Sequence, residues 1–490
     1  MEEKFENKFS NLLIKAVSQD ISCDMQGYKE MKIKRVMIAA PKSGSGKTTI
    51  TCALLQSLNK AGQQVVSYKC GPDYIDPMFH KKILGIPSKN LDTFFTGEDT
   101  RTLFLNNRTE EDFVVIEGVM GIFDGLGGIR EEGSSYHLAK ITKTPIILVV
   151  DAKGMGRSVI PMISGFLSYD EEHLIKGVLL NRMSKSYYEM IKTLIEEELD
   201  ICVVGYFADH QQFTIESRHL GLMMPEELTH INDKLSEISQ SFEQTASVDE
   251  IVRIAEQAEE LEYRALPVWY KENTDRNSPI IAVARDEAFC FYYEDNLLML
   301  KENGAKIEFF SPLHDKKLPD GCNGFLIGGG YPELYAEALS ANTDMLKEIK
   351  NAMVQRMPMV AECGGFMYLH TAMIDKEGKS HTMAGVIPAI CHDTGTLVRF
   401  GYIELEERGS HFLPEGGRIR GHEFHYFDSS DNGNDCQAFK PVTGKSYSCI
   451  ITGENYFLGF PHLYYPSNPS FAKSFVEKAR AYQNSHQDFA

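Results

Sequence analysis

Short apolar runs alternate with longer, mixed stretches along the first half of the chain, starting near residue 34. Uninterrupted short runs are typical of buried strands, and the stretches between them are long enough for helices. The alternation therefore predicts βαβ units that build a mostly parallel sheet. We expect its strands at residues 35–39, 64–69, 113–117, 144–151, 177–181 and 202–206, and its clearest helix at 47–61.

A second series of the same kind begins at residue 280, with predicted strands at 280–285, 306–311, 324–327 and 358–361. The connection before it is charged and helical and then loosens in K-E-N-T-D-R-N-S-P, which is typical of a domain boundary. We therefore divide the chain into an extension, a first α/β domain, a helical linker and a second α/β domain, with bounds 1–32, 33–235, 236–278 and 279–490.

Composition narrows the class of protein without naming its chemistry. The chain has 490 residues and a net charge of -19, which opposes binding to nucleic acid. No apolar run is long enough to cross a membrane, and the acidic start lacks a signal-peptide pattern. The ten cysteines form no C-x-x-C pair, so neither structural zinc nor a disulfide framework is indicated. We expect a cytoplasmic protein that binds neither membranes nor nucleic acid.

Residues 40–49, A-P-K-S-G-S-G-K-T-T, follow a predicted strand and open a helix. Glycine-rich backbone and a helix N-terminus present N–H groups to one point, which suits phosphate. Pro41 stands where G-x-x-x-x-G-K-S/T has its first glycine, and Lys42 is as compatible with a solvated lysine as with a phosphate contact. We expect ATP to be bound by Lys42, Ser43, Gly44, Ser45, Gly46, Lys47, Thr48 and Thr49.

Oxygen ligands for a metal lie near this loop. The Thr48 hydroxyl is placed to ligate Mg²⁺, while Lys47 would pair with the β and γ phosphates. Glu117 ends an apolar strand at the edge where ligands gather in such sheets, although a plain surface charge is the alternative. The turn-rich segment 69–77, K-C-G-P-D-Y-I-D-P, adds two carboxylates that could reach magnesium or a substrate.

The second half carries a single thiol in a strand–turn–helix context, M-V-A-E-C-G-G-F at residues 359–366. Such a nucleophile elbow exposes Cys363, and the helix N-terminus is expected to lower the thiol pKa. Backbone N–H groups of Gly329, Gly330 and Gly364 are candidates for an oxyanion hole. The alternative is that Cys363 is only a small buried residue.

The base for this thiol must come from elsewhere in the chain. We select His462, in G-F-P-H-L-Y, over His422 and His425, in G-H-E-F-H-Y. The spacing H-E-x-H is one residue short of the helical zinc motif, so the latter segment is expected to be a loop that lines the site.

With both halves in view, the sequence resembles the cobyrinic acid a,c-diamide synthases, glutamine-dependent amidotransferases of cobalamin biosynthesis. The resemblance extends from about residue 34 to the C-terminus and depends on S-G-S-G-K-T-T, K-C-G-P-D-Y-I-D-P, E-G-V-M-G-I-F-D-G, G-G-G-Y-P-E, A-E-C-G-G and His462. It implies a P-loop NTPase-like domain of the dethiobiotin synthetase and MinD type, followed by a class I glutamine amidotransferase-like domain of flavodoxin-like α/β fold.

The resemblance also implies a ligase mechanism with cobyrinic acid, L-glutamine and ATP as substrates and Mg²⁺ as cofactor. Cys363 attacks the glutamine amide, His462 raises its nucleophilicity, and ammonia reaches a carboxylate that ATP has phosphorylated, first at one side chain and then at the second. By the family's pattern, magnesium lies near Thr48, Asp73 and Glu117, and the substrate lies near Tyr74 and Asp76.

Some alternatives stay open. His462-Leu463-Tyr464 lacks the H-x-E of ordinary class I enzymes, so the third member of the site is open, with Glu423 as a guess. The substrate could instead be hydrogenobyrinic acid or nickel sirohydrochlorin. A MinD- or ParA-like ATPase without amidation, and a regulator that has lost activity, are the rival classes. The sequence does not decide between monomer and homodimer, nor does it show the ammonia route or the role of residues 1–32.

Overall fold

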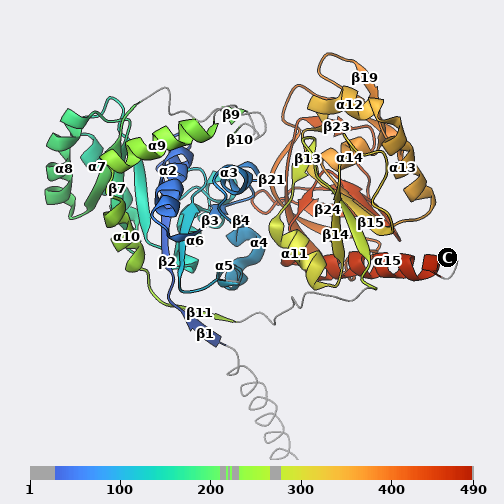
Figure 1. The fold of residues 1–490 in the computed structure, drawn as a ribbon, viewed down its shortest axis with the longest axis horizontal. Coiled ribbons are helices and arrows are strands. Elements are labelled where there is room, and N and C mark those ends of the chain that lie inside the picture. The colour runs from blue at the N-terminus through green and yellow to red at the C-terminus, as the bar shows by residue number, and fades with distance from the viewer. Residues whose placement is uncertain are drawn as a thin grey trace, which may run out of the picture.

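The structure is a computed structural model that describes residues 28–106, 108–209, 217–218, 221–222, 231–264 and 277–487. Two α/β domains lie side by side, with the first on the left and the second on the right of Figure 1. The predicted extension falls outside the described residues up to position 27. No helix in the described part of the chain is long and apolar enough to cross a bilayer.

The first domain is built on a seven-stranded parallel sheet with strand order β4-β3-β5-β2-β6-β7-β8. The predicted strands are confirmed to within two residues at each end, and the short edge strand β4 is added. Its polar sequence, Ser88-Lys89-Asn90, gave no apolar signal. The strands are β2 Lys34–Ala39, β3 Gln64–Cys70, β4 Ser88–Leu91, β5 Asp112–Glu117, β6 Ile146–Asp151, β7 Ile175–Asn181 and β8 Cys202–Phe207.

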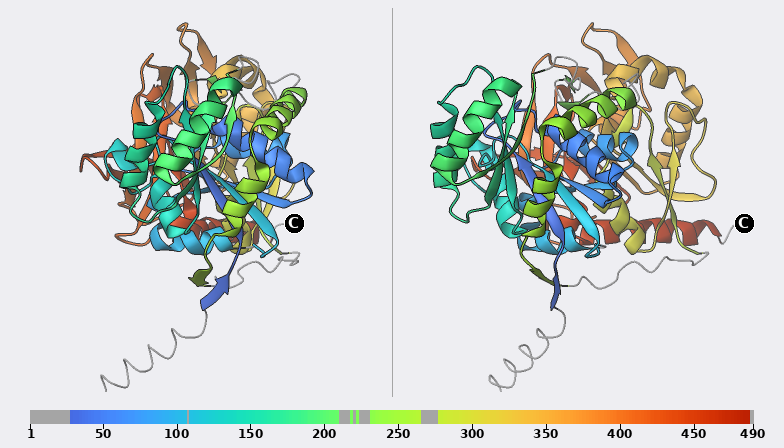
Figure 2. Two further views of the ribbon diagram at one scale, coloured as in Figure 1. Left: turned by 90° about the vertical axis from the view of Figure 1, so that its left-hand side faces the viewer. Right: turned by 60° about the vertical axis from the view of Figure 1, so that its left-hand side comes forward.

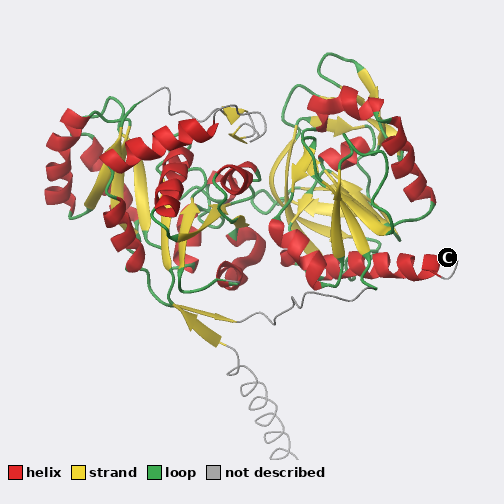
Figure 3. Cartoon of the chain, viewed as in Figure 1, coloured by secondary structure: helices red, strands yellow, loops and turns green. Residues whose placement is uncertain are grey.

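Helices cover both faces of this sheet (Figure 3). Because side chains alternate along a strand, Val36 and Ile38 face one core cluster and Met37 and Ala39 face the other. The α-helices are α2 Lys47–Lys60, α3 Ile75–Ile83, α4 Thr93–Thr96, α5 Thr100–Leu105, α6 Ser135–Ile141, α7 Val159–Tyr169, α8 Lys185–Leu199, α9 Ile231–Thr245 and α10 Val248–Glu256. Short 3-10 turns occur at Gly97–Asp99 and Leu126–Gly128, and two-residue strands at Ser217–Arg218 and Gly221–Leu222.

The helical part of the predicted linker belongs to the first domain. Leu235, Ile238 and Phe242 of α9 are buried in the same cluster as Leu54 and Leu58 of α2. The apolar face of α9 and α10 thus completes the core instead of bridging two domains. Strand β11, Leu261–Arg264, then pairs antiparallel with β1, Tyr28–Met31, in the ribbon that projects from the domain in Figure 2. Residues 265–276 of the predicted linker lie outside the described part of the chain.

The second domain contains a six-stranded sheet with order β14-β12-β15-β17-β27-β26, parallel except for the β26–β27 edge pair. The four predicted strands are confirmed and form its first four positions. The strands are β12 Ile280–Ala284, β14 Lys306–Phe310, β15 Cys322–Ile327, β17 Met359–Glu362, β26 Ile451–Gly453 and β27 Tyr456–Gly459. The helices are α11 Glu294–Glu302, α12 Ala336–Ala341, α13 Thr343–Val354, α14 Gly364–Tyr368 and α15 Ser470–Gln487, with 3-10 turns at Pro332–Tyr335 and Tyr465–Ser467.

Two further sheets, in orders β25-β24-β21-β22-β28 and β19-β18-β20-β23, and the two-stranded sheet β13-β16 pack around this one. The prediction that the segment G-H-E-F-H-Y forms a loop is wrong. The segment lies at the end of strand β22, which pairs with both β21 and β28. Pairing on both sides supplies the hydrogen bonds that its mixed polarity did not predict. The strands are β13 Phe289–Phe291, β16 Gly329–Gly330, β18 His370–Ile374, β19 Ser380–Thr382, β20 Ile387–Asp393, β21 Arg399–Glu407, β22 Arg418–His425, β23 Phe427–Ser429, β24 Cys436–Phe439, β25 Ser446–Cys449 and β28 His462–Leu463.

Candidate active sites

Cys363 lies in the sharp turn between β17 and α14. Its backbone has φ 48° and ψ -105°, a conformation that costs a non-glycine residue free energy. Hydrogen bonds hold the turn on both sides: Cys363 N–H donates to the Gly459 carbonyl at 2.8 Å, and Gly365 N–H donates to the Gly328 carbonyl at 2.9 Å. The turn thus has the strained geometry of a nucleophile elbow.

The glycines predicted for the oxyanion hole lie beside this turn and leave no room for side chains. A Cβ on Gly329 would lie 2.4 Å from Cε1 of His462, and one on Gly330 would lie 2.1 Å from the Ala288 carbonyl oxygen. The Cβ position of Gly364 is 3.2 Å from the Gly330 nitrogen. The backbones of Gly330 and Gly364 therefore approach each other closely, as two N–H donors to one oxyanion must.

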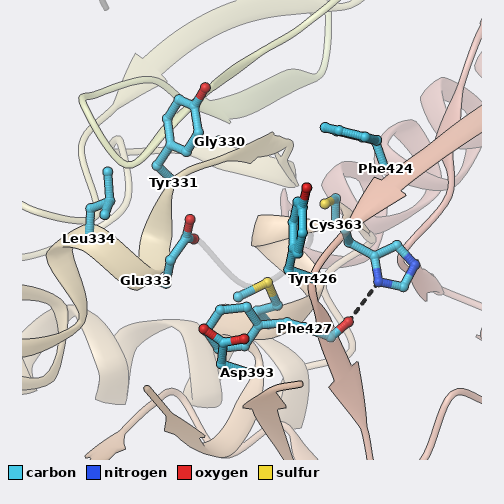
Figure 4. A pocket seen from close by; sticks show the side chains of 11 residues that line it. Gly330, Tyr331, Glu333, Leu334, Cys363, Asp393, Phe424, Tyr426 and Phe427 are labelled. Carbon is cyan, nitrogen blue, oxygen red and sulfur yellow. Dashed lines mark hydrogen bonds between the residues drawn. The ribbon is translucent and has the colours of Figure 1, made fainter. Parts of the chain in front are cut away.

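A cavity of about 260 Å³ opens at Cys363 (Figure 4). Pockets for drug-sized ligands span roughly 300–1,000 Å³, so this volume suits a ligand as small as one amino acid. Four of its lining residues are tyrosine or phenylalanine. The lining residues are Gly330, Tyr331, Glu333, Leu334, Cys363, Met367, Asp393, Phe424, His425, Tyr426 and Phe427.

The surroundings of Cys363 favour the protonated thiol over the thiolate. Burial raises its pKa well above the ordinary value, and the carboxylates of Glu333 and Glu362 raise it further. The Gly364 N–H opposes these effects but does not overcome them. The expected lowering by the helix N-terminus is therefore wrong for this state: α14 has only five residues, and desolvation dominates.

His462 is a neutral base over the physiological pH range. Burial lowers its pKa to about 3, with His425 adding to the effect and Glu423 opposing it. Its Nδ1 atom has no hydrogen-bond partner among the described residues. Among the described residues, then, no carboxylate hydrogen-bonds to this atom, and burial favours the uncharged forms of both the thiol and the imidazole.

The other candidates around His462 have different roles. His422 stacks on His462, with ring centroids 4.9 Å apart, and the Tyr293 hydroxyl is 3.1 Å from its Nδ1 atom. His425 lines the cavity and donates from Nδ1 to the Phe427 carbonyl at 2.6 Å. Since both belong to β22, they support the site from one strand.

Glu423, our guess for the third member, is engaged elsewhere. Its carboxylate oxygens lie 3.5 Å from Arg399 Nη1 and 3.5 Å from Lys440 Nζ, and the Tyr447 hydroxyl donates to it. It acts on His462 only through its field. In the part of the chain that the structure describes, no orienting carboxylate contacts His462.

The phosphate loop is shaped by two glycines with left-handed backbone, Gly44 with φ 75° and Gly46 with φ 94°. A Cβ on Gly46 would also lie 2.2 Å from Nδ2 of Asn181. Asn181 donates from this atom to the Ser45 carbonyl at 2.7 Å, and Arg182 donates to the Gly44 carbonyl. Sequence reasoning placed Asn181 only at a strand end and missed both supports.

Lys47 begins α2 and is buried against the loop. Its ammonium donates to the Met120 carbonyl at 2.6 Å and lies 3.5 Å from the Lys42 carbonyl. Burial lowers its pKa to about 8, and Lys69 lowers it as well. By contrast, the side chains of Lys42 and Ser43 are exposed. Of the two lysines in the loop, Lys47 is the one held in place before a phosphate arrives.

A buried charged cluster lies behind the loop, at the carboxyl ends of β3 and β5. Glu117 Oε1 accepts from the Thr48 hydroxyl at 2.6 Å and from Lys69 Nζ at 2.9 Å. Lys69 also pairs with Asp76, and His80 Nε2 is 3.5 Å from Glu117 Oε2. Lys69 and His80 were missed by sequence reasoning. The signal for Lys69 was its place at a strand end directly before G-P-D, inside a segment already singled out.

The carboxylates of this cluster respond differently to burial. Burial and Asp76 raise the pKa of Glu117 to about 7, against the effect of Lys69. Burial alone would raise that of Asp76, but Lys69 and His80 bring it below the ordinary value. Lys69 therefore neutralises Asp76 more fully than Glu117, and Glu117 is the carboxylate that a further cation would stabilise.

The oxygen donors present fit Mg²⁺ when phosphates complete the shell. Glu117 Oε2 has no hydrogen-bond partner among the described residues, and the Thr48 hydroxyl donates to the other oxygen of the same carboxylate. No ready-made group of three or more acidic, histidine or cysteine ligands occurs in the described part of the chain. This matches the habit of Mg²⁺, which binds through one or two carboxylates plus substrate phosphates.

The segment 73–76 connects the two sites. Asp73 Oδ1 accepts from the N–H groups of Ile75 at 2.8 Å and Asp76 at 3.3 Å, and so satisfies two donors in the first turn of α3. Asp76 points into the charged cluster. Tyr74 points the other way: its ring stacks on Phe291 at 5.1 Å and lies 5.3 Å from the His462 ring. The residue expected near the substrate is thus buried where the domains meet.

Polar contacts fix this interface around the aromatic rings. Lys89 Nζ pairs with Asp295 at 2.6 Å, the Tyr402 hydroxyl donates to Asp92 at 2.6 Å, and Arg420 donates to the Phe94 carbonyl at 2.6 Å. Asp92 is buried and the other side chains in these contacts are only partly exposed, so solvent screens these contacts less than it screens ion pairs on the open surface. The thiol site and the charged cluster are therefore held in one arrangement.

Comparison with known proteins divides the chain into the same two domains. The family model described as the CobQ/CobB/MinD/ParA nucleotide binding domain matches residues 36–220, and the CobB/CobQ-like glutamine amidotransferase domain matches residues 280–461. Among curated proteins, the cobyrinate a,c-diamide synthase of Caldanaerobacter subterraneus is 37% identical over 455 residues, covering 91% of this chain and 98% of that protein. The same enzyme of Clostridium acetobutylicum is 37% identical over 452 residues, covering 91% and 100%. That of Priestia megaterium is 34% identical over 463 residues, covering 94% and 100%.

Proposed function

Because this chain belongs to the cobyrinate a,c-diamide synthases, we propose that it amidates the a and c carboxylates of cobyrinic acid with ATP and glutamine. The observation that supports this most strongly is the pairing of sites in one chain: an elbow thiol in its cavity, and a phosphate loop with a carboxylate cluster. The segment 73–76 contacts both of them.

In the second domain, Cys363 Sγ attacks the γ-carbonyl of glutamine while His462 accepts the thiol proton. The backbone N–H groups near Gly330 and Gly364 stabilise the oxyanion. His462 then returns the proton to the amide nitrogen as its C–N bond breaks, so that ammonia leaves. Water hydrolyses the remaining thioester to glutamate and free Cys363. Because the resting pair is neutral, charge separates only when an amide is present to receive the sulfur.

In the first domain, the loop and Lys47 hold the triphosphate of ATP. Mg²⁺ would be held by Thr48 and Glu117 together with the phosphates, with Asp73 nearby, and would supply neutralisation of the γ-phosphate charge. The substrate carboxylate attacks this phosphate, giving ADP and an acyl phosphate. Ammonia then displaces phosphate to form the amide, and the cycle repeats at the second carboxylate.

Tyr74 and Asp76 connect these half-reactions. Asp76 is tied to Lys69 in the phosphate site, whereas Tyr74 contacts His462. A shift of this short segment on binding of substrate would be felt at the base of the other site. The two contacts support a role for this segment in transmitting substrate binding from one site to the other. Tyr74 itself is buried between the domains.

The test is a parallel incubation of the enzyme with cobyrinic acid, hydrogenobyrinic acid and nickel sirohydrochlorin, each with ATP, Mg²⁺ and glutamine. Mass spectrometry should show two successive carboxylate-to-amide changes with cobyrinic acid as the best substrate. A higher kcat/KM for either other tetrapyrrole would move the assignment to it. ATP hydrolysis that glutamine and tetrapyrroles leave unchanged would favour a partitioning-type ATPase.

A further inference from the structure

Two carboxylate side chains, Glu333 and Asp393, line the cavity that holds Cys363, and none of its described lining residues is a lysine or arginine. Glu333 lies in the 3-10 turn that follows β16, and Asp393 is the last residue of β20. In Figure 4 both lie on the side of the cavity away from the Cys363 sulfur. The cavity therefore has a nucleophile at one end and negative charge at the other.

Among the described residues, no salt bridge forms to Glu333 or Asp393. The backbone N–H of Glu333 is the group that lowers the pKa of its own carboxyl. Asp393 accepts one hydrogen bond, from Gly395 N–H at 2.7 Å. Burial raises the pKa of Glu333 to about 7, and Asp393 raises it as well. Two such groups in a partly desolvated cavity are stabilised by an added cation.

We infer that Glu333 and Asp393 bind the α-ammonium group of glutamine and thereby direct its γ-amide toward Cys363. This rests on the proposed function and adds to it the residues that select the amino acid. Tyr331 and Tyr426 line the cavity as well and can cover the methylene groups between the two ends. The α-carboxylate then points away from the acidic pair, since like charges at that end would repel it.

The inference makes the α-amino group the feature that is recognised. An analogue without it, 4-carbamoylbutanoate, keeps the reacting amide but offers the acidic pair no cation. Wild-type enzyme should therefore hydrolyse glutamine with a kcat/KM about 10- to 100-fold higher than this analogue, as expected for one charged hydrogen-bonding partner. Glu333→Gln and Asp393→Asn should lower kcat/KM for glutamine by a similar factor and leave the analogue nearly unchanged.

The experiment measures this ratio for wild-type, Glu333→Gln, Asp393→Asn and the control Glu337→Gln, whose carboxylate is exposed on α12. The same set is alkylated with 6-diazo-5-oxo-L-norleucine, which carries the α-ammonium, and with iodoacetamide, which does not. We expect the first reagent to label Cys363 about tenfold or more slowly in both cavity variants, with iodoacetamide labelling and the control unchanged. Equal slowing by both reagents would indicate a disturbed fold and would overturn the inference.

The outcome also separates the inference from its premise. Wild-type enzyme that hydrolyses glutamine, with variants that keep the full preference for glutamine over 4-carbamoylbutanoate, would overturn only the assignment of Glu333 and Asp393. Wild-type enzyme that hydrolyses neither compound would overturn the proposed glutaminase activity, and the inference with it.

Discussion

The phosphate site and the thiol site are both buried, but they handle charge in opposite ways. At the phosphate site Lys69, Asp76, Glu117 and His80 form a dense cluster in which an internal ammonium stands between two carboxylates. At the thiol site burial keeps Cys363 and His462 uncharged. The groups of the phosphate site are charged before its ligand arrives, whereas the reacting thiol and imidazole of the other site become charged only during reaction.

The difference fits the chemistry that we propose for each site. Phosphate and magnesium bring large charges, so preorganised cations and carboxylates stabilise them at little reorganisation cost. An amide is neutral, and a permanent thiolate would hydrolyse glutamine or become oxidised without need. Substitutions that remove charge should therefore affect the two sites in different ways.

The largest effect is expected from removal of the thiol. Cys363→Ala should lower glutamine-supported amidation by on the order of 10⁴-fold or more, because the covalent step is lost. Amidation supported by a high concentration of ammonium salts should persist, since the phosphate site is untouched. Amide formation with each nitrogen source is the measurement. Loss of both activities in a folded variant would contradict the two-site account.

A substitution in the phosphate loop should have the opposite selectivity: it should impair amidation and spare glutamine hydrolysis. Lys47→Ala removes an ammonium that Met120 and Lys42 carbonyls hold in place, and should lower amidation from either nitrogen source by on the order of 10²- to 10³-fold. Glutamine hydrolysis at Cys363 should continue. Glutamate release and amide formation are assayed side by side, and equal loss of the two would show that the sites are not separable.

Charge removal within the cluster should cost stability. Lys69→Met leaves Asp76 and Glu117 buried without their shared cation. The substitution should lower the free energy of unfolding by about 3–5 kcal/mol near neutral pH. The penalty should shrink as acid protonates the carboxylates. Urea unfolding measures it, with the exposed Lys317→Met as the matched control. A cost no larger than that of the control would contradict the view of Lys69 as the internal counterion.

A smaller effect is expected at the contact between the sites. Tyr74→Leu removes the stack on Phe291 and the contact with His462, whereas Tyr74→Phe keeps the ring. Aromatic pairs contribute about 0.5–1.5 kcal/mol, so Tyr74→Leu should reduce glutamine hydrolysis about two- to tenfold when ATP and cobyrinic acid are present. Equal rates of glutamine hydrolysis in the two variants would show that the Tyr74 ring does not couple the two sites.

The smallest effect is a pH dependence at the glutamine cavity. Because the pKa of Glu333 is raised to about 7, acid protonates it and removes charge from the acidic end. The KM for glutamine should therefore rise as pH falls from about 8 to about 6. Asp393, Cys363 and His425 also line the cavity, so the profile is compared with that of Glu333→Gln, which should lose this dependence. If Glu333→Gln keeps the same dependence of KM on pH, another titratable group causes it.

The sequence predicted the parallel strands well because strands buried on both faces, such as 113–117, are continuous apolar runs. It predicted the antiparallel strands poorly. β22 is Arg418-Ile419-Arg420-Gly421-His422-Glu423-Phe424-His425. Its Arg420 and Glu423 pair with Glu404 and Arg399 of the neighbouring strand β21. Such partners are distant in sequence and leave no local pattern.

The site residues divide along the same line. Lys47, Glu117 and Cys363 stand in short motifs with a physical reason at each position, so spacing alone indicated them. Lys69 and His80 act through a contact with Glu117, and Glu333 acts through a cavity shared with Asp393 from another sheet. These roles depend on tertiary proximity, which a single sequence does not display.

The most direct test of the central claim is the fate of the amide nitrogen. The enzyme is given cobyrinic acid, ATP, Mg²⁺ and glutamine with an isotopically labelled amide nitrogen, in the presence of unlabelled ammonium, and the product is weighed by mass spectrometry. If nitrogen released at Cys363 passes to the carboxylate activated at the phosphate loop, both new amides should carry the label with little dilution. Product whose label is diluted to the level of the surrounding ammonium, or no diamide at all, would contradict it.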